Sequence, residues 1–249
     1  MSEVVHYGVA DEVATITLDS QSNRNALSKA LVSGVFAGID AAEADDAVKV
    51  VVIRAEGSVF CAGADMSEAT SDGMEEGART IVELQRRIVA SSKPFVVRVH
   101  GAVRAGGIGI VAACDIAVSA DTATFALTEV RLGLAASVIS LSVLPRMTSR
   151  AASRTLLTGE TFDGAAAQAM GLVTTAVPEA DLDAELDKVL ADLRKGHPQG
   201  LREGKALLNK ELLGYIETHA DERATLSARL FGSDAAREAM LAFLNRKRG

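Results

Sequence analysis

The chain has 249 residues, a net charge of −7 at pH 7 and two cysteines. Its length fits one large domain or a domain with a helical extension. The negative charge argues against general binding of nucleic acid or an anionic membrane surface, and two cysteines are too few for a disulfide framework or a zinc site. The first residues lack a basic leader with an apolar core, and no run of 18 uncharged apolar residues occurs, so we expect a cytoplasmic protein without a membrane span.

Apolar runs and turn residues predict alternating strands and helices along the first hundred residues. β-Branched residues mark a strand, apolar residues at near-helical spacing mark a helix, and a continuous apolar run marks a buried parallel strand. Pro94 is expected to end a helix and begin a strand. The predicted elements are, in order, a strand at 13–18, a helix at about 26–44, a strand at 48–53, a small-residue turn at 58–66, a helix at 80–90 and a strand at 95–99.

The stretch 100–131 is the centre of the predicted site. Three glycines, Gly106, Gly107 and Gly109, open a short apolar helix that ends near Cys114, and a strand at 115–119 follows. Glycines at a helix start let backbone N–H groups approach a ligand oxygen, where the helix dipole favours negative charge. Glu129 lies among apolar residues and is therefore a candidate proton carrier. The stretch predicts an oxyanion site with one carboxylate beside it.

After Gly133 the pattern becomes mainly helical. We expect helical segments between 141 and 157, a short helix at 162–171 followed by a strand at 172–177, and C-terminal helices at 182–193, 200–216, 219–230 and 234–245. These C-terminal segments are charged on one face and apolar on the other. The prediction is an α/β core over residues 1–190 and a helical region over residues 191–249 that packs on the core or on a neighbouring subunit.

Two glycine-bearing turns, each after an apolar strand, offer open amides: Ala64 after Gly63, and Gly106 at a helix start. Two such donors on one carbonyl oxygen would stabilise an enolate, and losing one typically costs about 2.7–4 kcal/mol in the transition state. Proton transfer alpha or beta to a carbonyl is the reaction class that this pair predicts. A dinucleotide site is a weaker alternative, because Gly107-x-Gly109-x-x-Ala112 fits that pattern but lies too far from the preceding strand for the tight turn it needs.

Five segments resemble the crotonase, or enoyl-CoA hydratase/isomerase, superfamily over about residues 5–180. In chain order they are RNAL at 24–27, FCAGADM at 60–66, AGGIG at 105–109 with AACD at 112–115, TEVRLGL at 128–134, and the TGETFDGAAAQAMGLV run at 158–173. The resemblance implies an α/β spiral of ββα units with a C-terminal helical region that forms homotrimers or hexamers built as dimers of trimers.

The resemblance also implies an acyl-CoA thioester substrate whose carbonyl oxygen lies between the amides of Ala64 and Gly106, with Glu129 as the catalytic acid or base. Coenzyme A is then part of the substrate, and no separate cofactor or metal is expected. The positions expected to line the substrate groove are Arg24, Ala26, Ala62, Asp65, Met66, Gly107 and Gly109. Asp65 is expected to serve mainly as a helix cap.

The chain departs from the two-acid hydratases of that superfamily. It has Gly109 where they carry a first glutamate and Glu129 at the position of the second, so it resembles the single-glutamate hydratases. One such subgroup acts on branched glutaconyl-type thioesters, but Ala135 and Ala136 stand where its proline is usual. We expect an enoyl-CoA hydratase; a double-bond isomerase using the same glutamate, or a non-catalytic acyl-CoA-binding oligomer, stays open.

Overall fold

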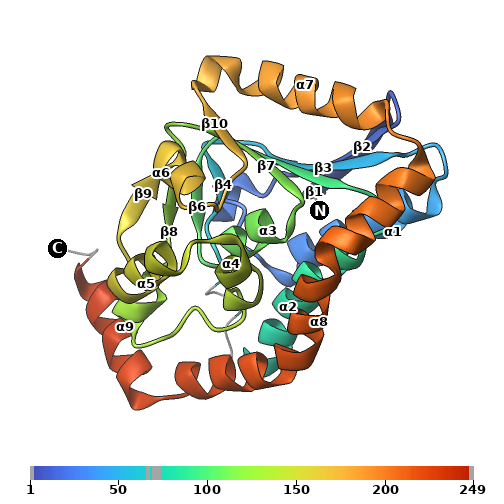
Figure 1. Ribbon diagram of the computed structural model, residues 1–249. Coiled ribbons are helices and arrows are strands. Elements are labelled where there is room, and N and C mark those ends of the chain that lie inside the picture. The colour runs from blue at the N-terminus through green and yellow to red at the C-terminus, as the bar shows by residue number, and fades with distance from the viewer. Residues whose placement is uncertain (1–2, 66–67, 69–73, 247–249) are drawn as a thin grey trace.

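A computed structural model describes residues 3–65, 68 and 74–246, and its strands form two sheets (Figure 1). The larger sheet has six strands in the order β1-β2-β3-β5-β7-β10. β1 and β2 pair antiparallel, and the remaining neighbours pair parallel. The strands are β1 (Val5–Ala10), β2 (Val13–Leu18), β3 (Val50–Ala55), β5 (Phe95–Val99), β7 (Ile116–Ala120) and β10 (Thr175–Val177).

The smaller sheet has four strands of three residues each, in the order β4-β6-β8-β9. They are β4 (Val59–Cys61), β6 (Ala102–Arg104), β8 (Thr124–Ala126) and β9 (Thr161–Asp163). β4, β6 and β8 run parallel, and β9 is antiparallel to β8. Because the first three strands point the same way, the segments that leave their carboxyl ends meet at one edge of this sheet.

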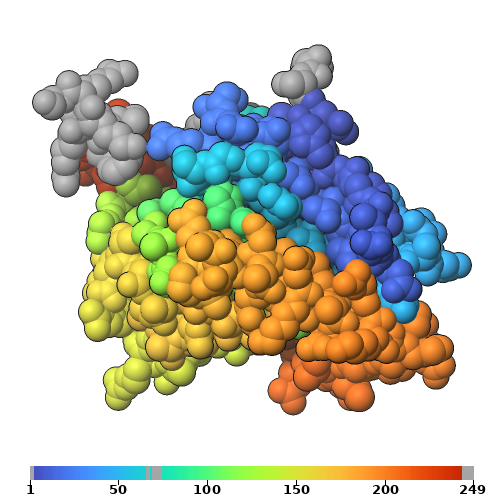
Figure 2. Space-filling view, turned by 90° about the horizontal axis from the view of Figure 1, so that it is seen from above, coloured from blue at the N-terminus to red at the C-terminus, as the bar shows by residue number. Residues whose placement is uncertain are grey.

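Helices cover both faces of the larger sheet. α1 (Lys29–Ala44) packs so closely on β2 that a β-carbon on Gly38 would come within 2.9 Å of the Ile16 side chain. α7 (Leu182–Arg194) lies on the opposite face, where Asp183 accepts a hydrogen bond of 2.6 Å from Arg98 of β5. Seen from above, this orange segment lies beside the blue N-terminal strands (Figure 2). The expected α/β architecture is confirmed.

The remaining helices surround the smaller sheet and extend around the body. They are α2 (Met74–Ala90), α3 (Gly106–Ala113), α4 (Ser140–Arg146), α5 (Ser149–Thr158), α6 (Gly164–Ala169), α8 (Pro198–Phe231) and α9 (Asp234–Arg246), with short 3-10 turns η1 (Gln21–Asn23), η3 (Thr128–Leu132) and η4 (Glu179–Asp181). In Figure 1, α7, α8 and α9 frame the rest of the chain. The expected helical C-terminal region is confirmed. α7 runs unbroken through residue 190, and a domain division at that residue stays a prediction.

A buried ion pair joins α8 to the larger sheet. The Lys205 ammonium lies 2.9 Å from Asp115 Oδ2 and donates to the carbonyls of Ile88 and Lys93. Asp115 also accepts from Asn209 of α8 and from the backbone amide of Phe95. A buried charge is tolerated when it is paired and hydrogen-bonded, as here, so this cluster fixes where α8 crosses the core.

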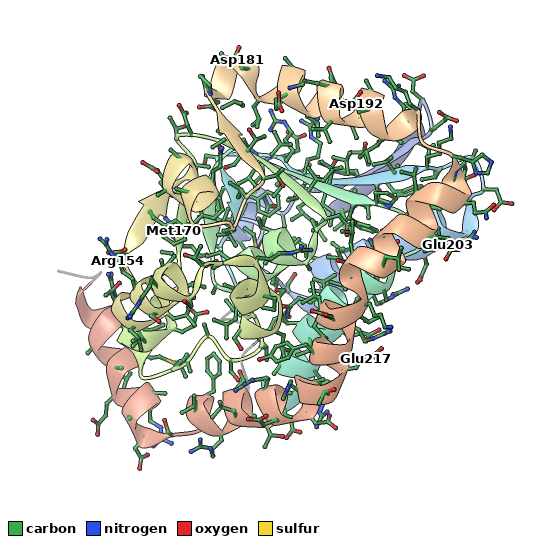
Figure 3. All side chains as sticks on the ribbon, viewed as in Figure 1. Arg154, Met170, Asp181, Asp192, Glu203 and Glu217 are labelled. Carbon is green, nitrogen blue, oxygen red and sulfur yellow. The ribbon has the colours of Figure 1, made fainter. Side chains whose placement is uncertain are left out.

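The prediction of two helices at 200–216 and 219–230 is wrong, because α8 is one helix of 34 residues. Glu203 and Glu217 both lie along it (Figure 3). The hydroxyl of Thr218 donates to the Gly214 carbonyl at 2.7 Å, a side-chain bond that bends helices without ending them. The polar break in the apolar pattern therefore marks a bend in Figure 1 and not a loop.

Further boundaries differ from the sequence prediction, and among them β10 begins at Thr175 and not at residue 172. The first helix begins at Lys29, not near Ala26, because the Ser28 hydroxyl accepts from the Leu31 amide and caps it. α2 begins at Met74, before Thr80. Phe162 belongs to β9 and not to a helix, because its ring stacks on Phe125 of β8, and α6 starts only after Asp163 caps it.

Candidate active site

Three segments meet at the carboxyl edge of the smaller sheet. Residues 62–65 follow β4, residues 105–106 follow β6, and residues 127–129 follow β8. The Arg104 guanidinium helps hold two of these strands in place, since it donates to the Thr124 carbonyl at 2.6 Å. The topology therefore brings together Ala64, Gly106 and Glu129, which the sequence predicted as one site.

The first open amide belongs to Ala64. Ala64 forms an isolated parallel bridge with Leu27, in which the Leu27 amide donates to the Gly63 carbonyl at 2.8 Å. Nearby, the Ala62 amide donates to the Arg24 carbonyl at 3.1 Å. Within the part of the chain that the structure describes, the Ala64 amide itself has no protein acceptor. The turn is held through its neighbours, and one N–H is left for a ligand.

The second open amide belongs to Gly106, the first residue of α3. The first amides of a helix have no partner inside it, and among residues 3–65, 68 and 74–246 no other acceptor faces this one. Ala105, just before it, has φ 45° and ψ −117°, a conformation that costs a residue with a side chain about 1–3 kcal/mol. Such strain is kept where neighbouring structure fixes it, and here the Ala105 amide bonds to the Ala126 carbonyl of β8.

The glycines of the second turn permit close packing on the first segment. A β-carbon on Gly107 would come within 2.7 Å of the Cys61 β-carbon, and one on Gly106 within 2.6 Å of the Leu27 side chain. The Cys61 β-carbon is fixed to the backbone, so a side chain at position 107 would push α3 away from β4. The Leu27 methyl group is the end of a flexible side chain and can shift, so this close approach requires glycine at position 107.

Glu129 supplies the carboxylate. It lies in η3, and its Oε2 atom is buried with no hydrogen-bond partner among the described residues. Burial raises the pKa of Glu129 to about 7, and a hydrogen bond from its own backbone amide offsets this only in part. η3 is closed by Gly133, whose α-carbon packs against Ala235 and Ala236 of α9. An unpartnered carboxyl with a pKa near neutrality can both take and give a proton at pH 7.

Neighbouring side chains fill the space where a side chain at position 109 would lie. A β-carbon there would come within 2.8 Å of Ile139 Cγ2 and 3.4 Å of the Gln85 amide carbon. The Gln85 amide donates to the carbonyls of Ile81 and Val138, and its oxygen accepts from the Ser142 hydroxyl at 2.7 Å. None of the atoms nearest to that point in the described structure belongs to a carboxyl, imidazole or amine group.

Other predicted groove residues lie around the first turn. The Arg24 side chain is exposed, Ala26 is buried, and Ala62 is half-buried. Asp65 accepts a hydrogen bond of 2.9 Å from the Asn23 side chain. Met66, and the start of the helix that Asp65 was expected to cap, lie outside the described residues.

Comparison with known proteins assigns the family. The sequence profile described as Enoyl-CoA hydratase/isomerase matches residues 8–249. The chain belongs to the crotonase superfamily. A crystal structure of an enoyl-CoA hydratase from Mycobacterium avium is similar to this crotonase with a TM-score of 0.93 and 47% sequence identity, over 99% of this chain and 98% of that one.

Two relatives show how the chain compares in sequence with other members of the family. It is 33% identical over 207 residues to the mitochondrial enoyl-CoA hydratase domain-containing protein 3 of Rattus norvegicus, covering 81% of this chain and 69% of that protein. It is 28% identical over 250 residues to the 2,3-dehydroadipyl-CoA hydratase of Escherichia coli, covering 99% and 97%. These likenesses support an enzyme of the enoyl-CoA hydratase/isomerase family, which acts on acyl-CoA thioesters.

Sequence reasoning missed two residues that shape the site of this crotonase. Asn25 is buried and has φ 53°. Its side-chain oxygen accepts a hydrogen bond from the Ser20 amide, and its side-chain nitrogen donates to the carbonyls of Glu56 and Val59. These bonds hold the RNAL segment against β4. Asparagine is enriched at positive φ, so an Asn in a turn was a usable signal. Ala105 carries the strain before Gly106, and nothing in its residue type indicated this.

Metal-binding groups, membrane-spanning helices and reactive cysteines are the other features of functional interest. Among the described residues, no group of three or more His, Cys, Asp or Glu side chains is placed to hold a metal ion. Within the same residues, no helix combines the length and the apolar character needed to cross a bilayer. Both cysteines are buried, and burial raises the pKa of each thiol, which makes them poor nucleophiles.

Proposed function

We propose that this crotonase is an enoyl-CoA hydratase that adds water across the double bond of a 2-enoyl-CoA thioester. The observation that carries the proposal is the buried Oε2 of Glu129, at the same sheet edge as two amides; none of the three has a hydrogen-bond partner among the described residues. In the proposal, Ala64 and Gly106 donate to the thioester oxygen and Glu129 transfers the proton. Coenzyme A enters as part of the substrate, and no separate cofactor takes part.

The reaction needs one carboxylate in two roles. Ionised Glu129 takes a proton from water, and the resulting hydroxide bonds to C3 of the enoyl group. The electron pair of the C2–C3 double bond moves onto the thioester oxygen, and the enolate is stabilised by the two amide donors. Protonated Glu129 then delivers the same proton to C2, so that one water has been added. A pKa near 7 supports both roles at neutral pH.

Substrate contacts complete the proposal. In the proposal, the exposed side chain of Arg24 would meet the phosphates of coenzyme A, and Ala26, Ala62, Asp65, Met66 and Gly107 would line the groove. We further propose a cytoplasmic homotrimer, or a hexamer built as a dimer of trimers. Leu207 and Leu208 on α8 are 78% and 81% exposed, and apolar side chains this exposed favour a subunit contact.

Incubation with thioesters tests the reaction. Loss of the enoyl absorbance of 2-butenoyl-CoA with formation of 3-hydroxybutanoyl-CoA is the expected result for the wild-type protein. Conversion of 3-enoyl-CoA to 2-enoyl-CoA without hydration would replace hydratase by isomerase. That alternative keeps some support, because with Ile139 beside Gly109 only one proton-transferring group is present in the described site. Tight thioester binding without either reaction would instead support a non-catalytic acyl-CoA-binding protein.

A further inference from the structure

Ile139 closes the side of the candidate site that faces α3. Position 109 lies one helical turn after Gly106, and residues three apart on a helix are neighbours on one face. We take an acyl chain whose carbonyl oxygen is held at Gly106 and whose C2 and C3 reach Glu129 to run past this turn. Ile139 Cγ2 lies 2.8 Å from the point where the β-carbon of a side chain at position 109 would be.

The position of Ile139 is fixed from three sides. Its carbonyl accepts from the Val143 amide at 3.0 Å as α4 begins, and the preceding carbonyl, of Val138, accepts from the Gln85 amide of α2. The Ser142 hydroxyl joins Gln85 to the Gly109 carbonyl of α3. Three helices are thereby fastened around one isoleucine that is 2% exposed, so its side chain has little freedom to move aside.

We propose that Ile139 is a specificity-determining residue: it forms the α3-side wall of the acyl site and restricts the thioester to chains without a branch at C3. The proposal rests on the function proposed above, because it assumes an acyl-CoA held at Ala64 and Gly106. It opposes the branched, glutaconyl-type substrate that the sequence resemblance implied. A fixed wall of this kind discriminates one added carbon by about 10–200-fold.

Binding of two saturated thioesters tests the wall without requiring turnover. Butanoyl-CoA and 3-methylbutanoyl-CoA differ by one methyl group at C3, and neither can be hydrated. By calorimetry, the wild-type protein is expected to bind the branched thioester at least about tenfold more weakly. Ile139→Ala should reduce this ratio to about threefold or less. Ile39→Ala is the matched control, because Ile39 on α1 is equally buried at 2% exposed, and it should keep the wild-type ratio.

Each outcome decides a separate point. An unchanged ratio in folded Ile139→Ala, or equal binding of both thioesters by the wild type, overturns the wall and leaves the proposed function standing. If the wild type binds neither thioester, the acyl-CoA site itself is wrong and both proposals fall. If Ile139→Ala does not fold, Ile139→Val, which removes one methyl, is measured in the same way, and a ratio that does not fall then overturns the proposal.

Discussion

The α-carbon of Gly63 lies directly against the methyl group of Ala105. A β-carbon on Gly63 would come within 3.0 Å of Ala105 Cβ and 3.2 Å of the Arg104 carbonyl oxygen. The turn that holds the Ala64 amide and the turn that holds the Gly106 amide thus pack together at their bases, with no room for a side chain between them. The distance between the two proposed donors is therefore set by backbone packing and not by flexible side chains.

Gly63→Ala should separate the two turns. Gly63 has φ 93°, which disfavours any side chain, and the new methyl group would press on Ala105. Displacing one oxyanion donor typically lowers kcat by about 10²–10³. We expect a fall of that order in hydration of 2-butenoyl-CoA, with a lower Tm.

Gly204→Ala is the matched control for that substitution. Gly204 lies inside α8, and a β-carbon there would meet no atom within 4 Å. Alanine in a helix is favoured over glycine by about 1 kcal/mol, so Tm should rise slightly while kcat stays unchanged. A Gly63→Ala enzyme with kcat within threefold of the wild type would contradict the role of this contact.

The pH dependence of hydration should follow Glu129. Burial raises its pKa to about 7, and the proposed base must be ionised to take a proton from water. kcat/KM should therefore fall about tenfold per pH unit below pH 7 and level off above it. Glu129→Gln should lower kcat at least about 10²-fold at pH 8 and still bind butanoyl-CoA. Glu179→Gln is the control, because Glu179 is an exposed carboxylate in η4, and it should keep the wild-type pH profile. A profile centred near pH 4.5 would remove Glu129 as the base.

The same carboxyl should cost the folded protein stability at high pH. Its pKa is raised on folding, from 4.5 to about 7, so the native state binds the proton more tightly than the unfolded state. The free energy of unfolding should then fall as pH rises from about 4.5 to about 7, and the full cost should be present above pH 7. Glu129→Gln removes the charge, so at pH 8 it should be more stable than the wild type by up to about 3 kcal/mol.

Urea unfolding at pH 4.5 and pH 8 measures this difference. At pH 4.5 the wild-type carboxyl is largely protonated in the native state, and the two proteins should unfold at nearly the same urea concentration. Equal stability of Glu129→Gln and the wild type at pH 8 would show that Glu129 is not buried in the way described.

Ala105→Gly should trade activity for stability. Glycine adopts φ 45°, ψ −117° without strain, so the free energy of unfolding should rise by about 1 kcal/mol. The peptide that presents the Gly106 amide would be less firmly fixed, and kcat should fall several-fold while KM changes little. Ala165→Gly, at an exposed position within α6, should instead lower stability by about 0.5–1 kcal/mol and leave kcat alone. A lower free energy of unfolding for Ala105→Gly than for the wild type would contradict the claim that the Ala105 backbone is strained.

Much of the larger sheet could be predicted from the sequence. β2, β3, β5 and β7 are apolar runs of strand length buried in the interior, and each prediction lies within about two residues of the observed strand. β1 was missed because all of its residues except Val5 are exposed, so it has no buried alternating face. α8 was divided in two because a polar step in its pattern was taken for a loop.

The smaller sheet, which builds the site, was beyond sequence reasoning. Its strands have three residues each, too few for a period to show, and the pairing of β4 with β6 and of β6 with β8 joins segments more than 20 residues apart. Ala64, Gly106 and Glu129 were nevertheless predicted as one site, from the turn glycines, an acid among apolar residues and the resemblance to the crotonase superfamily. Ile139 gave no such signal, because its position beside Gly109 depends on how α4 packs on α3.

The proposed reaction depends on the amides of Ala64 and Gly106 binding one thioester oxygen beside Glu129. A crystal structure of Glu129→Gln with bound 2-butenoyl-CoA would show this arrangement. We expect the thioester oxygen at about 2.7–3.1 Å from both amide nitrogens, with the side chain at position 129 facing C2 and C3. A thioester oxygen bound by only one of these amides or by neither, or a side chain at 129 turned away from C2 and C3, would contradict it.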